Sequence, residues 1–276
     1  MVETSPVIEI RPPARGLQHP LRELWQHRTL VGFFVWRDLK VRYRQTLVGA
    51  TWAILQPLVL MVVFTVFLSG IIEVPGGEVS YAVFVFLGLV PWTLFSQSVS
   101  QSANSVVNHQ DLVRKAAFPR LVLPVAAVGP YLVNFAVATV VAIVAVVIAT
   151  GRLSVTVLVI PLVGLLALTA SLAIGIGLSA LNVRYRDVKY GTPFLLQAWL
   201  FATPVVYPPD LAPEALRGLL YLNPMTGVVG AYRWAMLGTD PPSLVALVLS
   251  IGSSLVLLAA AVAFFSRSEE TFADTI

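Results

Sequence analysis

Amide side chains recur along one long apolar segment of this chain. Gln97, Gln101, Asn104 and Asn108 follow each other at intervals of four, three and four residues, which places them on one face of a helix. An amide inside a bilayer must find a hydrogen-bonding partner, on a neighbouring helix or in a water-filled path. Two interpretations stay open: the stripe holds helices together, or Gln97, Gln101 and Asn104 line a hydrophilic path.

Residue patterns for covalent and hydrolytic chemistry are missing from the sequence. A phosphate-binding loop ends in Gly-Lys-Ser/Thr, but Lys40, Lys115 and Lys189 follow Leu, Arg and Val. Neither G-x-S-x-G nor H-E-x-x-H occurs. His109 has no second His or Cys nearby, so we expect a solvated surface residue rather than a metal ligand. The sequence predicts no catalytic, cofactor-binding or metal site and excludes ATP hydrolysis by this chain.

The elements that carry these residues are membrane helices. The chain is 57% hydrophobic and only 12% charged, with a mean hydropathy of +0.83, and its apolar segments are continuous rather than alternating. About 20 such residues cross a bilayer as a helix. We therefore expect an all-α polytopic membrane protein whose six spans cover residues 49–72, 81–107, 121–149, 154–181, 189–207 and 243–265.

Charge placement limits the source of energy. The acids, bases and histidines can all lie at the ends of the spans or between them. Gradient-driven pumps normally keep an ionisable group at membrane depth. The sequence therefore indicates a pathway whose energy is supplied from elsewhere.

The positive charge also predicts the orientation. Fifteen of the 18 Lys and Arg residues fall on one side of the six spans, and only Arg152, Arg217 and Arg233 fall on the other. The positive-inside rule places the basic side, with both termini, in the cytoplasm. The same distribution argues against nucleic acid as the partner of this basic chain.

The sequence divides into three regions, of which the last forms the membrane domain. Residues 1–20 are a proline-broken, flexible cytoplasmic arm, and residues 21–46 are an amphipathic helix on the membrane surface, in contact with membrane lipid. Residues 47–276 form the six-span domain. Within it, the connection of residues 108–120 predicts a short helical knob, and Ala167, Ser171, Gly175 and Ser179 form a ridge for close helix packing.

Residues 212–238 hold two apolar pieces that are each too short to cross a membrane. Asn223 and Pro224 divide them, and Pro224 breaks any single helix through both. We expect a re-entrant helical hairpin on the outer side between spans five and six, which also contains Tyr232 and Arg233. Aromatic residues such as Trp92, Phe95 and Tyr207 have two interpretations, packing or the lining of a path for sugar rings.

Several ordered motifs resemble one known family. They are W-R-D-L-K-V-R-Y-R at 36–44, L-Q-P at 55–57, F-P-R at 118–120, N-V-R-Y-R-D-V at 182–188, Y-L-N-P-M-T at 221–226 and A-Y-R at 231–233. In this order and spacing the chain resembles the permease subunit of bacterial type-2 ABC exporters for O-antigen, teichoic acid and capsule polysaccharides. The resemblance covers about residues 35–240 and the final span.

The resemblance implies a homodimer in the bacterial inner membrane with two copies of a separate ABC ATPase, which binds ATP and Mg. The cargo would be a lipid-linked glycan, and the outer hairpin would help to close the pore. Coupling to the ATPase would fall to the following residues: Arg37, Lys40, Arg42, Arg44, His109, Asp111, Arg114, Lys115, Arg184 and Arg186.

Other functions remain open at this stage. Exporters of drugs or other lipids share this layout. An intramembrane sugar-lipid transferase would need acids near the headgroups, and Glu73, Glu78, Asp210, Glu214 and Asp240 qualify by location only. A gradient-driven transporter is disfavoured by the missing intramembrane acids.

Overall fold

The computed structural model describes residues 18–44, 51–72, 79–116, 118–269 and 272, and this part of the chain is helical and contains no strand. The elements in chain order are α1 (Gln18–Gln26), α2 (Arg28–Arg44), α3 (Thr51–Leu68), α4 (Tyr81–Asn108), α5 (Gln110–Lys115), α6 (Val122–Ala126), α7 (Gly129–Thr150), η1 (Val155–Val159), α8 (Ile160–Arg184), α9 (Asp187–Phe201), η2 (Pro209–Leu211), α10 (Glu214–Leu222), α11 (Pro224–Leu237) and α12 (Leu244–Ser268).

Four of these helical segments are long and apolar enough to cross a membrane. They are α4, α6 with α7, η1 with α8, and α12. The all-α prediction is therefore confirmed, as are four of the expected spans. Helices α3 and α9 lie in the two remaining predicted spans but are shorter, with 18 and 15 residues.

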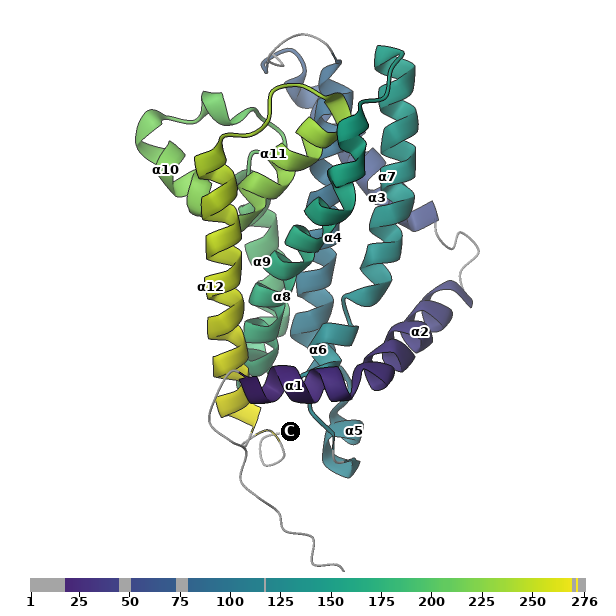
Figure 1. Ribbon diagram of the computed structural model, residues 1–276, viewed down its shortest axis with the longest axis vertical. Helices are drawn as coiled ribbons and strands as arrows, with labels where there is room; N and C mark the ends of the chain where they lie inside the picture. Colours follow the sequence, from purple (N-terminus) through teal and green to yellow (C-terminus); the bar gives the residue numbers. More distant parts are fainter. Residues whose placement is uncertain (1–17, 45–50, 73–78, 117, 270–271, 273–276) are drawn as a thin grey trace, which may run out of the picture.

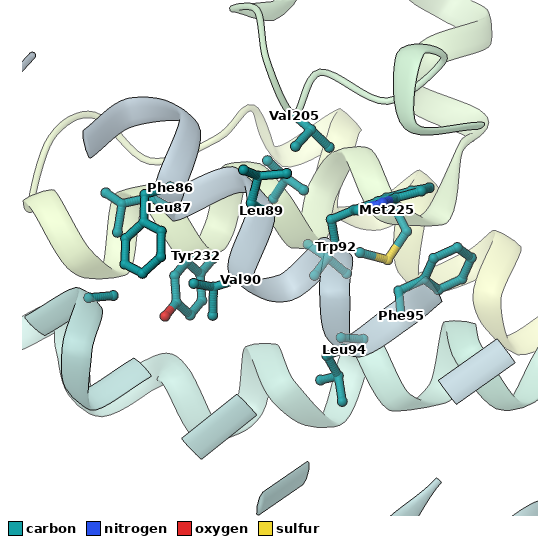
Figure 2. Close-up of a cluster of buried hydrophobic side chains, with 14 of the residues drawn as sticks. Phe86, Leu87, Leu89, Val90, Trp92, Leu94, Phe95, Val205, Met225 and Tyr232 are labelled. Atoms are coloured by element: carbon teal, nitrogen blue, oxygen red, sulfur yellow. The ribbon is translucent and has the colours of Figure 1, made fainter. Parts of the chain in front are cut away.

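Helix α4 is the centre of the bundle. In its most apolar 18-residue stretch, 78% of the residues are buried, against 28% to 39% in the other three candidate spans. Its side chains from Phe84 to Phe95 are almost all enclosed, and Figure 2 shows several of them together with Val205, Met225 and Tyr232 from the segments that cover them. A helix that is buried on all sides needs apolar residues all round, which explains why α4 shows no simple amphipathic stripe there.

The predicted ridge of small residues on α8 is confirmed as a packing surface. Ala167, Ser171 and Ser179 are fully buried, and Gly175 lies so close to α4 that an added Cβ would be 2.5 Å from the Cβ of Ser102. Helices approach this closely only where one of them lacks a side chain. The contact fixes α8 against the central helix.

The bundle has two distinct ends (Figure 1). Helices α1 and α5 and the C-terminal end of α12 lie at one end, which we call the α5 end. Helices α10 and α11 lie at the opposite end, the α11 end. The first and last described elements therefore share one end of the molecule.

Three predicted elements differ in detail from the structure. The helix expected over 21–46 is two helices, because the chain turns at His27, whose Nδ1 lies 2.8 Å from the Glu23 carbonyl. The expected third span is broken between α6 and α7, just before Pro130, which lacks the N–H that a continuous helix would need there. The fourth begins as the 3-10 helix η1 and continues to Arg184. Residues 1–17 of the expected arm lie outside the described residues.

Candidate functional site

Arg37 joins α2 to the end of α4. Its guanidinium donates to the Asp38 carboxylate at 2.8 and 2.9 Å, and its NH2 group lies 2.6 Å from Nε2 of His109. The same guanidinium lies 4.7 Å from the ring centre of Phe34. The other ring nitrogen of His109, Nδ1, lies 2.8 Å from the carbonyl oxygen of Ser105. His109 is thus half-buried and hydrogen-bonded at both nitrogens. The prediction that it is a solvated surface residue is therefore wrong.

The other end of α2 is attached to α7. Arg42 donates to the hydroxyl of Tyr131 and lies over its ring, and the Tyr43 hydroxyl donates to Asn134 at 2.6 Å. These contacts hold α2 along the bundle, and its position at the membrane surface stays a prediction. Arg37 is partly buried by its contacts, whereas Lys40 and Arg44 of the same helix are exposed.

The ten predicted coupling residues divide into two groups. Arg37, Arg42 and His109 are partly buried in contacts within the chain. The remaining seven are exposed on the surface: Lys40, Arg44, Asp111, Arg114, Lys115, Arg184 and Arg186. Helix α5 projects beyond the bundle at the α5 end (Figure 1), as expected for a helical knob. The coupling role of both groups stays a prediction.

The C-terminal end of the chain fastens the same region, which the sequence did not predict. The Arg120 amide donates to Oε1 of Glu269 at 2.9 Å, and the Arg120 side chain donates to the Glu269 carbonyl oxygen. Phe272 is fully buried against Phe265, with ring centres 5.3 Å apart. Burial raises the pKa of the Glu269 carboxyl, against the opposing effects of the Arg120 amide and charge. The contacts of Arg120 with Glu269 hold the segment between α5 and α6 to the end of α12.

The four amide residues of α4 have different surroundings. Gln97 donates to Gln56 of α3 at 2.6 Å, and the Asn104 side-chain oxygen accepts from Asn182 of α8 at 3.2 Å. These two residues therefore join helices. Gln101 is exposed instead, on a helix that is otherwise largely buried. Asn108 is exposed at the helix end.

The aromatic candidates lie mainly in the core. Trp92 and Phe95 are 5% and 0% exposed, and Phe95 contacts Trp199 of α9 with ring centres 5.4 Å apart. Tyr207 is half-buried and donates to the Phe201 carbonyl at 3.0 Å. In this arrangement Trp92 and Phe95 position α4 against α9, and their assignment to a path stays a prediction.

Arg233 is the most enclosed charged residue at the α11 end. It donates to the carbonyl oxygens of Phe84 at 3.3 Å, Pro204 at 2.8 Å and Val205, and it lies 3.6 Å from the ring centre of Phe84. Its side chain is only 8% exposed. Arg233 lies between the predicted spans, as expected, but it is buried there, because carbonyl dipoles and a ring face surround its guanidinium in place of water.

The turn between α10 and α11 is anchored by Asn223. Its side-chain oxygen accepts from the Met225 amide and begins α11, with Pro224 at the first helical position. Its amide group donates to Thr203 at 2.8 Å and to the Ala202 carbonyl at 3.1 Å. Tyr232 is fully buried, with its hydroxyl 3.0 Å from that of Thr139. Asn223, Tyr232 and Arg233 thus attach this segment to the bundle, and Pro224 begins α11.

Comparisons with known proteins agree on one family. The ABC-2 type transporter family matches residues 29–237. The O-antigen export system permease protein RfbA of Myxococcus xanthus is 35% identical over 261 residues, which cover 93% of this chain and 98% of that protein. A protein of the same name from Klebsiella pneumoniae is 25% identical over 245 residues, with 87% and 92% covered.

Proposed function

The chain belongs to the ABC-2 type transporter family, and from that premise we propose that it is the permease subunit of an ABC exporter for O-antigen-type polysaccharide. It moves a lipid-linked glycan from the cytoplasm across the bacterial inner membrane. The observation that carries the proposal is the match to an O-antigen export permease over nearly the full length of both chains. A second ABC protein binds ATP and Mg and hydrolyses the nucleotide, since this sequence holds no phosphate-binding loop.

In this proposal the chain crosses the membrane six times, with α3 and α9 as the two short spans. At 1.5 Å per residue, the 18 and 15 residues of these helices cover about 27 and 22 Å of a hydrocarbon core of about 30 Å. Short spans are tolerated where the adjoining backbone is satisfied by protein. The turn after α9 meets that condition, because Arg233 and Tyr81 donate to its carbonyl groups.

Helices α10 and α11 form the re-entrant hairpin of the proposed topology. They are two separate helices, because Asn223 ends the first and begins the second, and Figure 1 shows both at the α11 end. Asn223 binds the tip of the hairpin to the end of α9, and Ser250 of α12 accepts from the Gly227 amide at 2.9 Å. The α11 end then faces outward, and the basic α5 end, with both termini, faces the cytoplasm.

The topology predicts which positions an impermeant thiol reagent reaches. Because the chain has no cysteine, single cysteines can be placed at exposed Glu214 and Asp240, on either side of the hairpin, and at exposed Asp111. We expect Glu214→Cys and Asp240→Cys to react in intact spheroplasts, and Asp111→Cys to react only after the membrane is opened. Protection of one hairpin position alone would indicate a seventh crossing, and labelling of Asp111→Cys in intact spheroplasts would reverse the orientation.

The translocation path of the proposed homodimer runs along the face formed by α3, α4 and α9. Each of these helices has an exposed glutamine: Gln56, Gln101 and Gln197. The Gln97–Gln56 bond aligns α3 with α4, and the Phe95–Trp199 contact aligns α9 with α4. Exposed amides are unfavourable against lipid tails, so this face suits a second copy and a polar cargo between the two.

Deleting the gene tests the proposed function directly. We expect surface polysaccharide to disappear and a lipid-linked glycan to accumulate on the cytoplasmic side, since synthesis continues without export. The wild-type gene should restore the surface glycan, and the tagged protein should co-purify with an ABC ATPase. Normal surface glycan together with accumulation of a different lipid or drug would assign another cargo.

A further inference from the structure

The contact between Arg37 and His109 has a defined protonation requirement. Arginine stays protonated in proteins and has only donor groups. The Arg37 NH2 group lies 2.6 Å from Nε2 of His109, so Nε2 must accept and cannot carry a proton. The Ser105 carbonyl is an acceptor only, so Nδ1 must carry the proton that it donates. The observed geometry therefore requires neutral His109 with its proton on Nδ1.

The surroundings of His109 leave few ways to keep this contact after a second proton binds. From α2 it faces Arg37 and, through it, Asp38, whose carboxylate already accepts from Arg37. From α4 it faces the Ser105 carbonyl, and α4 contains no charged residue. The charged residues of its own connection, Asp111, Arg114 and Lys115, are exposed. The Phe118 segment, which packs against Phe34, brings Arg120, and that side chain is held by Glu269.

We propose that Arg37 and His109 are positioning residues that join α2 to the α4–α5 connection, and that protonation of His109 releases this join. A protonated imidazole would place an N–H and a positive charge against the guanidinium, where the neutral ring places a lone pair. Arg42 and Tyr43 still hold the far end of α2 to α7. Buried Phe34 and the close contact of Val35 with Gly129 also hold the middle of α2, so protonation loosens the polar contact of α2 with α5 without detaching α2.

The join matters for transport because of its place in the bundle, a step that rests on the proposed function. The exposed coupling candidates Lys40 and Arg44 lie on α2, and Asp111, Arg114 and Lys115 lie on α5. Arg37 and His109 add a directional contact between these two groups, which buried Phe34 of α2 and Val113 of α5 also bring into one apolar cluster. An ATPase that contacts α2 and α5 then drives both together at neutral pH and less effectively in acid.

Substitutions at His109 separate the join from simple packing. In His109→Gln the side-chain oxygen takes the place of Nε2 as an acceptor and does not titrate. In His109→Asn the shorter side chain reaches the position of Nδ1 but not Arg37. Arg37→Ala removes the donor. The Gln variant should keep the join at every pH, and the other two should lose it at every pH.

The decisive measurement is the distance between α2 and α5 in the full chain. Spin labels on Phe33→Cys and Gln110→Cys, both at exposed positions, report it in lipid nanodiscs, with unlabelled chain in excess. We compare about pH 8 with about pH 5 and expect one narrow distance at the higher pH only. The narrow distance should persist in His109→Gln at both pH values and be absent from His109→Asn and Arg37→Ala at both.

Two outcomes overturn the proposal: a narrow wild-type distance at both pH values, or a pH response in His109→Gln equal to that of wild type. The second readout is ATP-driven glycan transport by the reconstituted complex, where the ratio of His109→Gln to wild type should rise from pH 8 to pH 5. A constant ratio overturns the role in coupling. If the distance responds to pH but no glycan moves at either pH, the proposed function fails and the join stands.

Discussion

Arg233→Ala is expected to lower the stability of the folded chain more than any other single substitution of a charged residue in its described part. The variant leaves the carbonyl groups of Pro204 and Val205 without the donor that they have now. Each buried, unsatisfied polar group costs about 1–3 kcal/mol, and the vacated volume adds to this. We expect a loss of about 3 kcal/mol or more, measured as a lower thermal unfolding midpoint of the protein in detergent.

Two variants give controls for this result. Arg217→Ala removes an arginine at the same end that donates to the carbonyls of Ala212 and Asp210 but is only partly buried, so we expect a loss below about 1 kcal/mol. Arg233→Lys keeps the charge but not the planar fork that reaches several acceptors, so it should remain close to the alanine variant. A midpoint for Arg233→Ala equal to that of Arg217→Ala would show that the buried guanidinium is not structurally required.

Gly88 tests the same junction from the side of α4. A Cβ there would lie 2.5 Å from the Val205 carbonyl oxygen and 2.6 Å from the Arg233 NH2 group. Gly88→Ala should therefore destabilise the protein by displacing that contact. Gly252→Ala on α12 is the matched control, because nothing lies within 4 Å of its Cβ position. Alanine favours helix there by up to about 1 kcal/mol, so the two variants should change stability in opposite directions.

Gln101→Leu is expected to reduce glycan export roughly tenfold while leaving the protein folded. The Gln101 side chain is exposed on the proposed path face, so leucine removes a hydrogen-bonding group without breaking a bond within the chain. A loss of about 0.7 kcal/mol at each of two subunits gives an effect of this size. Surface polysaccharide per molecule of permease in the membrane is the measurement.

Asn104→Leu is the matched control on the same stripe. This change removes the acceptor for Asn182, so we expect a lower unfolding midpoint and a lower amount of protein, with less effect on export per molecule. Full export by a normally folded Gln101→Leu protein would assign Gln101 to packing against another surface. Together, Gln101→Leu and Asn104→Leu show for each residue whether it holds helices together or lines a path.

Local sequence patterns predicted the elements of this fold well. Long apolar runs predicted α4, α7, α8 and α12, and Pro224 after Asn223 predicted the division of α10 from α11. The small-residue ridge on α8 also predicted a close helix contact. These patterns succeed because the period of a helix and the restricted backbone of proline act over a few neighbouring residues.

Contacts between distant segments were not predicted. Arg37 meets His109, Arg120 meets Glu269, and Arg233 reaches carbonyls in two other segments. The charged residues looked alike in sequence, as cations beside apolar segments, and whether each one faces water or the protein depends on what packs against it. The one signal in the sequence for the burial of Arg233 was its position in an apolar stretch of 11 residues that contains no acid.

The amino-acid sequence alone determined that this protein is a helical membrane protein, because hydropathy and the spacing of motif residues are properties of the linear chain. The tertiary structure decided which polar residues hold helices together and which remain available to a cargo or a partner. Gln97 and Gln101 illustrate the difference, since one is bonded to α3 and the other is exposed. The physical reason is that a hydrogen bond depends on the position of both partners, and packing of the whole bundle sets those positions.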